Sequence, residues 1–488
     1  MIASPFASPF TSRFLTLSCL VAWILIHPRV QGATEAPWPQ FRGPNASGVA
    51  AGAKPHLQIS PDSGLLWKVD LPWSPSSPVV WGDRIFLNTF DHGELQTRAY
   101  SRKDGSLLWT AGVTPEALEE FHRTDGSPAA STPATDGKHV VSYFGSFGLI
   151  CHDVEGKELW RHPMPVAKSA GKFGSGTSPI IMDQSVILSR EDPGQSRLIA
   201  LDLATGKPLW ETPRPDIYGS FGTPIVWLHD GRKELVVPGS LLLKSYVPDT
   251  GKELWSVSGL SAFTCTTPVI GEGRIYYGSW SPGGADNPWP AWSEFRTGRD
   301  KDGDGVIALE EIDVAQRDFL RALDLNDDDR ITEEDFTNLK RNSSRGKNTL
   351  IAVNPGGKGD ITESHVAWSF KKGLPYVPSP LYYEGRLYLI KDGGLFTCLN
   401  PETGEPYYEQ ERLEAGGSYY ASPVAADGRI YIASLPGKLS VMAAGGDTPK
   451  LLHRADFGER IFATPALVGD KLYLRTASRL YAFGDASP

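Results

Sequence analysis

The sequence predicts an all-β fold, an eight-bladed β-propeller that carries a small α-helical insertion. Glycine and proline account for 51 and 39 of the 488 residues, which disfavours long helices and supplies many turns. A Ser/Thr–Pro step before an apolar pair recurs eight times along the chain. Short strand-like runs separated by glycine turns follow each step, four to a repeat of about 44 residues, as expected of propeller blades.

The N-terminus is predicted to be a signal peptide over residues 1–32. Arg13 precedes an apolar run at 14–26, and Pro28 and Gly32 follow where a cleavage region is expected. The run is short for a membrane span, and an uncleaved signal anchor is the alternative. No later stretch has 18 uninterrupted apolar residues, so we expect an exported protein, periplasmic or extracellular, whose mature chain has no transmembrane segment. Residues 33–60 are expected to form an N-terminal extension.

The Ser/Thr–Pro steps mark the eight blades. They are Ser77-Pro78, Thr132-Pro133, Ser178-Pro179, Thr223-Pro224, Thr267-Pro268, Ser379-Pro380, Ser422-Pro423 and Thr464-Pro465. Successive prolines lie 42 to 55 residues apart, except that Pro268 and Pro380 are 112 apart. The long interval predicts an insertion over residues 285–345, between the second and third strands of one blade. The propeller then consists of residues 61–284 and 346–488.

The two ends of the propeller are expected to pair. The last repeat supplies only three strands before the chain ends, and a spare strand pattern at 65–70 precedes the first Ser/Thr–Pro step. If residues 65–70 become the fourth strand of the last blade, the ring closes and no sheet edge is left open between its ends.

The fourth strand of several repeats ends in tryptophan after a glycine turn. Residues 200–210 match in full the AxDxxTGKxxW tryptophan-docking motif of PQQ-type propellers, and weaker copies surround Trp109, Trp160, Trp255 and Tyr408. The chain from about 61 to 485 therefore resembles a PQQ-like repeat protein. That superfamily contains quinoprotein alcohol dehydrogenases and the non-enzymatic BamB-type outer membrane assembly factors. The resemblance implies that each indole packs against the neighbouring blade and is architectural.

The opening segment adds to this resemblance. Residues 38–45, Trp-Pro-Gln-Phe-Arg-Gly-Pro-Asn, are similar to the start of many such exported proteins in planctomycete-type bacteria.

If the chain were similar in function to the quinoprotein dehydrogenases, the resemblance would imply a bound PQQ cofactor. In those enzymes PQQ is clamped between a tryptophan and a disulfide of adjacent cysteines, beside Ca²⁺. Cys151, Cys265 and Cys398 are far apart in this sequence, and we interpret them as small buried strand residues. The catalytic metal ligands of those enzymes cannot be matched residue by residue. We therefore expect no bound PQQ and no catalytic or cofactor-binding residues, and favour a BamB-like scaffold. The alternative is a PQQ- and calcium-dependent dehydrogenase of alcohols or sugars.

One face of the ring is expected to bind a protein or polysaccharide partner. Its connections carry aromatic and ionisable residues: Trp73, His122, Arg123, Lys172, Phe173, Tyr218, Phe221, Phe263, Tyr376, Tyr419, Tyr420 and Phe462. The alternative is that they plug the channel entrance. Residues 116–122 in the longest connection are expected to form a helical lid. The net charge of −9 disfavours nucleic acid as a partner. The sequence does not indicate an oligomeric state.

The insertion contains an EF-hand loop at 300–311, which predicts a Ca²⁺ site. Hard oxygen ligands are expected from Asp300, Asp302 and Asp304 at positions 1, 3 and 5. Gly305 allows the sharp turn at position 6. The Val306 carbonyl and a bidentate Glu311 would complete the protein ligands.

A second loop begins 24 residues later and is a weaker match. Its predicted ligands are Asp324, Asn326, Asp328, the Arg330 carbonyl and Asp335. Asp329 replaces the turn glycine, and the shorter Asp335 replaces glutamate, so lower affinity is expected here. The apolar residues Ile312, Ala315, Phe319, Leu320 and Leu323 predict one helix between the loops, and a second helix should begin near Phe336. Residues 300–335 hold 14 acids and four bases, so the acidity of the chain is concentrated here.

Overall fold

The computed structural model describes residues 35–286, 288–321, 323–324 and 328–485. The predicted signal peptide at 1–32 and the predicted ligand Asn326 lie outside the described residues. No helix in the described part of the chain is long and apolar enough to cross a membrane.

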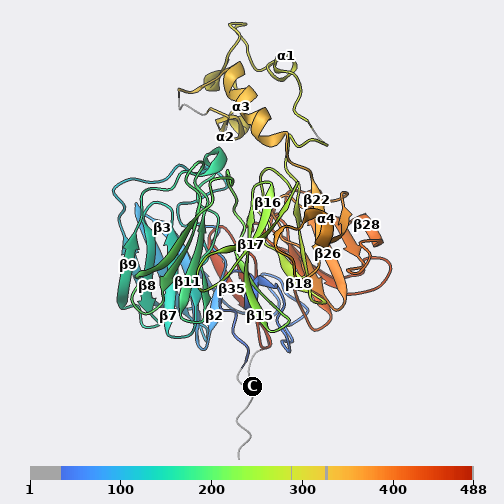
Figure 1. Ribbon diagram of the computed structural model, residues 1–488. Coiled ribbons are helices and arrows are strands. Elements are labelled where there is room, and N and C mark those ends of the chain that lie inside the picture. The colour runs from blue at the N-terminus through green and yellow to red at the C-terminus, as the bar shows by residue number, and fades with distance from the viewer. Residues whose placement is uncertain (1–34, 287, 322, 325–327, 486–488) are drawn as a thin grey trace, which may run out of the picture. The chain divides into compact units, whose positions relative to one another are not determined.

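Eight antiparallel four-stranded blades form a closed ring around a central channel, as predicted. Figure 1 shows the ring from the side. Blade 1 is β2(Val79–Trp81), β3(Arg84–Asp91), β4(Glu94–Ser101) and β5(Leu107–Val113). Blade 2 is β6(Ala134–Thr135), β7(His139–Phe144), β8(Gly148–Asp153) and β9(Glu158–Pro163). Blade 3 is β10(Ile180–Met182), β11(Ser185–Arg190), β12(Arg197–Asp202) and β13(Pro208–Pro213). Blade 4 is β14(Ile225–His229), β15(Arg232–Gly239), β16(Leu242–Tyr246) and β17(Glu253–Ser258).

The remaining blades continue in the same order. Blade 5 is β18(Val269–Gly271), β19(Arg274–Ser279), β22(Thr349–Val353) and β24(Val366–Phe370), and blade 6 is β25(Leu381–Tyr383), β26(Arg386–Lys391), β27(Leu395–Leu399) and β28(Pro406–Arg412). Blade 7 is β29(Val424–Ala426), β30(Arg429–Ala433), β31(Lys438–Ala443) and β32(Leu451–Asp456). Blade 8 is β33(Ala466–Val468), β34(Lys471–Arg475), β35(Arg479–Phe483) and β1(Leu65–Asp70). The antiparallel pairing of β1 with β35, with Val69 opposite Leu480, confirms the predicted closure of the ring.

The Ser/Thr–Pro steps form a ring of hydrogen bonds around the channel. In seven of the eight blade-to-blade contacts, the backbone N–H of one step residue donates to the hydroxyl oxygen of the step residue in the next blade, at 2.9–3.0 Å. Thr464 N–H donates to Ser77 Oγ and completes the circle. Hydroxyl residues recur at this position because they satisfy a buried backbone donor at these seven blade boundaries.

The docking tryptophans pack flat on glycines of the next blade. The pairs are Trp67 with Gly105, Trp109 with Gly156, Trp160 with Gly206, Trp210 with Gly251, and Trp368 with Gly404. Each indole N–H also donates to a backbone carbonyl of that blade, at 2.8–3.1 Å. Trp255 differs from the predicted role, because its Nε1 donates to Glu234 within the same blade.

This contact predicts a large difference between two otherwise similar substitutions. Gly206 and Gly231 both have positive φ, at +68° and +71°, so alanine costs about 1–2 kcal/mol at either position. A Cβ on Gly206 would lie 2.5 Å from the Trp160 ring, whereas one on Gly231 meets nothing within 4 Å. Gly206→Ala should therefore cost about 1–3 kcal/mol more than Gly231→Ala, measured by equilibrium urea unfolding. Equal losses in the two variants would contradict the docking role of the indole.

An N-terminal strap, residues 38–54, crosses the channel directly beneath the hydroxyl ring. It makes backbone hydrogen bonds to Val80 of blade 1, Thr135 of blade 2, Ala425 of blade 7 and Gly469 beside blade 8. The Asn45 side chain bonds both backbone groups of Val226 in blade 4, and Arg42 Nη2 donates to Pro380 O at 2.7 Å. Because the strap contacts the inner strands of so many blades, it closes that end of the channel.

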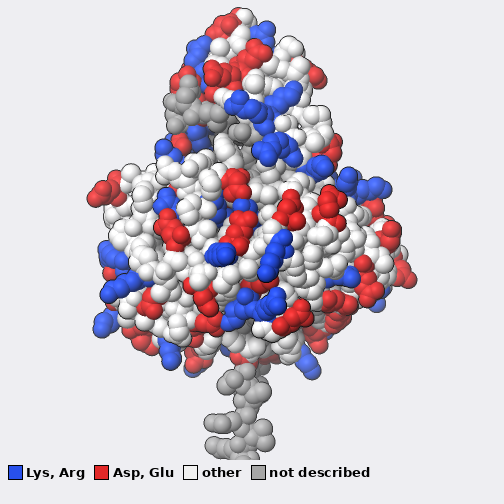
Figure 2. All heavy atoms as spheres, in the orientation of Figure 1, with Lys and Arg blue, Asp and Glu red and all other residues white. Residues whose placement is uncertain are grey.

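The insertion interrupts blade 5 between β19 and β22, as predicted. It contains α1(Trp292–Phe295), β20(Ile307–Ala308), α2(Val314–Arg321), β21(Arg330–Ile331) and α3(Glu333–Ser343). It has an apolar core of its own, which includes Phe295, Ile307, Ile331 and Phe336. Figure 2 shows acidic side chains gathered towards the tip of the insertion and basic side chains nearer the propeller.

The remaining short elements lie outside the regular blades. They are 3₁₀ turns at Pro44–Ala46, Ala170–Lys172 and Leu309–Glu311, strand β23(Gly359–Asp360) and helix α4(Thr362–His365). Strand β23 adds to β17 in parallel and covers the outer edge of blade 4.

Two expectations about local structure are wrong. Residues 116–122 are irregular rather than helical, because Glu119 turns inward, its N–H bonding Ser146 Oγ and its carboxylate bonding Ser175. Cys151 and Cys398 are buried in strands β8 and β27 as expected, but Cys265 lies in the loop between β17 and β18. There it forms part of the wall of a cavity.

Candidate functional site

A cavity of about 690 Å³ lies at the loop end of the channel, above the hydroxyl ring. Eight aromatic side chains line it: Phe41, Phe173, Phe221, Trp280, Trp289, Tyr376, Tyr420 and Phe462. Five of these were predicted on this face from the sequence; Phe41, Trp280 and Trp289 were not. Phe41 comes from the strap and Trp289 from the insertion, so three separate parts of the chain build one cavity. Its volume falls in the range of small-molecule sites.

The aromatic side chains form interlocking pairs around the mouth. Phe462 contacts Trp73 and Tyr420 with ring centroids 4.6 and 5.5 Å apart. His122 stacks on Phe173 at 5.6 Å, and Trp280 meets Tyr376 edge to face at 5.8 Å. These contacts fix the orientation of the rings, so the cavity presents flat apolar walls of defined geometry.

Asp125 is the one acidic residue in the cavity wall among the residues described. Its carboxylate accepts hydrogen bonds from Tyr420 Oη at 3.1 Å and from Arg460 Nη1 at 3.2 Å. Arg460 also lies over the Phe462 ring, 4.7 Å from its centroid. The negative charge of Asp125 is thus balanced by a neighbouring cation outside the wall itself.

Ser175 lines the cavity and is held by a buried carboxylate behind it. Both the backbone N–H and the hydroxyl of Ser175 donate to Glu119 Oε2, at 2.9 and 2.6 Å. Glu119 is 3 % exposed, and this burial raises its pKa to about 7, against the smaller opposing effects of the Ser175 hydrogen bonds and Arg190. The carboxyl group can therefore hold or release a proton near neutral pH.

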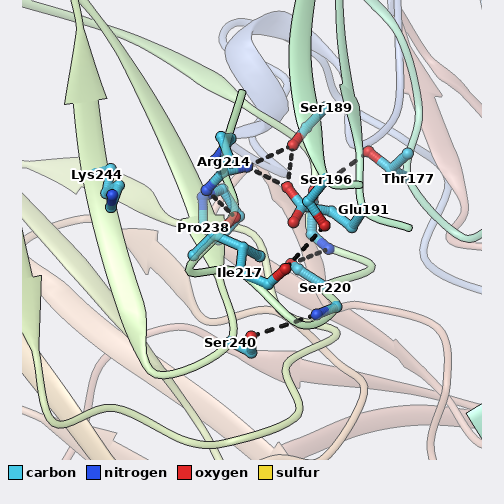
Figure 3. A network of polar contacts seen from close by, with 12 residues as sticks. Thr177, Ser189, Glu191, Ser196, Arg214, Ile217, Ser220, Pro238, Ser240 and Lys244 are labelled. Carbon is cyan, nitrogen blue, oxygen red and sulfur yellow. Dashed lines mark hydrogen bonds and ion pairs between the residues drawn. The ribbon is translucent and has the colours of Figure 1, made fainter. Parts of the chain in front are cut away.

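A buried ion pair supports the adjoining loops. Figure 3 shows the Arg214 side chain reaching Glu191 and Ser189, and the Ser189 hydroxyl also donates to Glu191. Arg214 Nη2 donates to Pro238 O of blade 4 at 3.2 Å, so the pair ties blade 3 to blade 4. Both side chains are essentially inaccessible to solvent, at 0 % and 2 % exposed. Neither contacts the cavity directly, which indicates a structural role.

The first predicted metal loop brings three of its acids together. Ligand atoms of Asp300, Asp302 and Asp304 lie within 4.8 Å of one another, the one such group among the described residues. Gly305 has φ +92°, as the sharp turn requires. Glu311 is held beside the start of the loop, because its Oε1 accepts from the backbone N–H groups of Lys301 and Asp302, at 2.8 and 3.1 Å. These residues present the oxygen donors that Ca²⁺ prefers.

The second predicted loop is described in part, without residues 325–327. Asp329 adopts φ +59° in place of the usual glycine, and Asp324 accepts its backbone N–H at 3.0 Å. Asp335, however, turns back to Thr332 and accepts both its N–H and its hydroxyl, which caps α3. Ile307 of the first loop lies opposite Ile331 of the second in the β20–β21 pair. Of the two residues predicted to contribute a carbonyl ligand, Arg330 lies in this pair and Val306 immediately precedes it.

The insertion joins the propeller beside the cavity. Ala285 N–H donates to Gly346 O, and Asn348 Nδ2 donates to Ser281 O, so the two connecting segments are held together. Trp289 follows four residues after Ala285; its Nε1 donates to Ser343 Oγ at 3.0 Å and its ring packs against Phe295 and Phe336. The same side chain thus belongs to both the insertion core and the cavity wall.

The cavity residues do not fit the PQQ site of quinoprotein dehydrogenases. Such a cofactor carries several carboxylates, yet the cavity wall contains no lysine or arginine among the residues described. Cys265 is the one cysteine in the wall, and burial raises the pKa of its thiol to about 12. We therefore derive no reaction step through that cofactor.

The fold and its repeats define a PQQ-like β-propeller with an insertion in the fifth blade. The chain belongs to the family described as outer membrane protein assembly factor BamB, whose model matches residues 56–226 and 346–486. The insertion lies in the gap between these two matched ranges. No curated protein sequence matches the chain.

Several solved structures share the fold at low identity. BamB from Moraxella catarrhalis is 13 % identical, with a TM-score of 0.55 over 88 % of this chain and 99 % of that one. A europium-containing methanol dehydrogenase is 13 % identical, with a TM-score of 0.54 over 92 % and 98 %. The computationally designed protein Ika8 is 12 % identical, with a TM-score of 0.53 over 86 % and 99 %. The fold is therefore common to BamB, a methanol dehydrogenase and a designed protein, and does not by itself define an activity.

Several site residues were not singled out from the sequence. Asp125 and Glu119 lie in an irregular connection that carries no motif, and Trp280 and Trp289 flank the start of the insertion. Phe41 falls within the opening segment 38–45, so the resemblance of that segment to related proteins was the one sequence signal for it.

Proposed function

We propose that this protein is an exported, calcium-binding PQQ-like β-propeller that acts as a non-catalytic binding or scaffold protein. The observation that supports the proposal is that the insertion, which contains the predicted EF-hand loop, contributes Trp289 to the wall of the aromatic cavity. Calcium bound at 300–311 would neutralise the clustered acids and hold the insertion in one conformation. In an environment rich in external Ca²⁺ the ion serves as a structural component.

The dehydrogenase alternative has less support. Its fold is compatible with the chain, but the described cavity wall contains no lysine or arginine, and the sequence has no adjacent cysteines for the cofactor to contact. The test is reconstitution with PQQ and Ca²⁺ followed by dye reduction with a panel of alcohols and sugars. Turnover would overturn the non-catalytic proposal.

The calcium site can be tested with two neighbouring glutamates. Glu311 is the predicted bidentate ligand, whereas Glu310 is exposed and occupies a position that contributes no ligand. Calorimetric titration of the wild type should show Ca²⁺ binding, and chelation should lower its Tm. Glu311→Gln should weaken binding to the first loop at least tenfold and reduce the Tm response, whereas Glu310→Gln should behave as the wild type.

The paired variants separate a specific site from general electrostatic attraction, since each removes one negative charge from the same loop. Equal weakening in both, or a wild type whose Tm does not respond to Ca²⁺, would refute the calcium proposal.

A further inference from the structure

We propose that the cavity binds the terminal sugar residues of a neutral carbohydrate chain. This inference rests on the proposed binding role of the loop face and names the class of ligand. Three features of the cavity carry it: a wall without uncompensated charge, flat apolar sides above a hydroxylated floor, and a closed end.

The charge of the wall favours a neutral ligand. The described wall residues include neither lysine nor arginine, so an anionic ligand would find no permanent cation there; the remaining basic side chain of the wall, His122, is bonded through Nδ1 to Thr124 and Asp125. Asp125 is already bonded to Tyr420 and paired with Arg460, so it offers a compensated carboxylate whose remaining acceptor capacity can bond hydroxyl groups. Burying an unpaired ligand charge here would be costly.

The distribution of polar and apolar groups matches a sugar ring. Phe173 and Phe221 meet edge to face at 6.5 Å on one side, and Trp280 and Tyr376 pair elsewhere in the wall. Beneath these rings the floor contains hydroxyl groups of the Ser/Thr–Pro steps, among them Ser77, Thr132 and Ser178. A pyranose has apolar C–H faces and hydroxylated edges, so its faces suit the aromatic sides and its edges suit the floor. The oxygens of these hydroxyls already accept a backbone N–H from the neighbouring blade, so the floor offers its hydroxyl hydrogens to the oxygen atoms at the edge of a sugar.

The strap makes the cavity a pocket with one entrance. Residues 38–54 bond to the inner strands beneath the hydroxyl ring, and Phe41 extends from the strap into the cavity. A polymer cannot run through a closed channel. The cavity therefore takes the end of a carbohydrate chain rather than an internal segment.

The experiment titrates the full chain with neutral hexasaccharides of glucose, xylose and N-acetylglucosamine, and with a hexamer of galacturonic acid as the charged counterpart. At least one neutral hexamer should bind, and the galacturonate hexamer should bind at least tenfold more weakly than that hexamer. For the sugar that binds, the long polymer at equal mass should occupy far fewer sites than the hexamer, because it has fewer ends.

Variants locate the binding. Phe173→Leu and Phe221→Leu keep apolar volume while removing a flat face, and each should weaken binding about five- to tenfold. Leu209→Ala is the matched control, since Leu209 is 53 % exposed on the outermost strand of blade 3 and does not line the cavity. A normal Tm in each variant establishes that the fold is retained.

The inference is overturned if no neutral hexamer binds, if the galacturonate hexamer binds as well or better, or if the leucine variants bind like the wild type. Equal occupancy by polymer and hexamer would overturn the preference for chain ends. These failures are distinct from failure of the proposed function, because the response to Ca²⁺ of wild type, Glu311→Gln and Glu310→Gln is measured without any sugar.

Discussion

Replacement of Glu191 by alanine should lower the free energy of unfolding by about 3–5 kcal/mol, because it leaves the Arg214 cation buried without its partner. Arg214 has no exposed surface, and Glu191 is its ion-pair partner. Burial raises the pKa of Glu191, and the positive charge of Arg214 opposes that rise. The pair also connects blade 3 to the backbone of blade 4 through Pro238, so the substitution should weaken the contact between these two blades.

The measurement is equilibrium urea unfolding of Glu191→Ala and of a double-mutant cycle made of Glu191→Leu, Arg214→Met and Glu191→Leu/Arg214→Met. The double variant should be more stable than the sum of the single losses implies, because it leaves no buried charge unpaired. Glu158→Ala is the matched control: Glu158 and Arg161 form an ion pair with 37 % and 48 % exposed side chains, worth about 0–1 kcal/mol. Similar losses in Glu191→Ala and Glu158→Ala would refute the argument.

Replacement of Glu119 by glutamine should make stability less dependent on pH. The ordinary pKa of glutamate is 4.5, and burial raises that of Glu119 to about 7. A raised carboxyl pKa means that the folded state binds the proton more tightly than the unfolded state. The contribution of Glu119 to stability is therefore present at low pH and is lost as pH rises from about 4.5 to about 7.

The size of the effect follows from the shift. A change of about 2.5 pKa units corresponds to roughly 3 kcal/mol. Glu119→Gln retains a side-chain oxygen that can accept from Ser175 but cannot ionise. The stability of Glu119→Gln relative to the wild type should therefore increase by roughly 3 kcal/mol between about pH 4 and pH 8. The measurement is urea unfolding of both proteins at several pH values.

The control is Glu211→Gln, where the carboxylate is 50 % exposed and pairs with Arg197 across β12 and β13. Its stability difference from wild type should vary little over the same range. If the Glu119→Gln difference were equally flat, Glu119 would not be the buried proton-binding group described above.

The architecture could be predicted because its signals are local and repeated. At seven of the eight boundaries a Ser/Thr–Pro step satisfies a backbone donor of the neighbouring blade, so the same short pattern recurs along the chain. The loop at 300–311 was recognisable for a related reason: one contiguous turn supplies all its predicted donors, and the structure brings Asp300, Asp302 and Asp304 together. Its occupancy by Ca²⁺ stays a prediction.

Prediction failed where long-range contacts determine local structure. Residues 116–122 have an apolar and acidic pattern compatible with a helix, but the contacts of Glu119 with Ser146 and Ser175 hold them in an irregular conformation. Trp255 follows the same sequence pattern as the docking tryptophans, yet Glu234 takes its indole N–H. A hydrogen-bond partner far along the chain decided the outcome in both places.

The sequence by itself determined the number of blades, the closure of the ring by its two ends and the position of the insertion, because each follows from a pattern repeated over neighbouring residues. Only the tertiary structure decided that Phe41, Trp280 and Trp289 join the predicted aromatic residues in one closed cavity. It also decided that Ser175 is backed by Glu119. The physical reason is that a cavity is formed by side chains from connections of several blades, and their convergence depends on how the ring packs rather than on spacing along the chain.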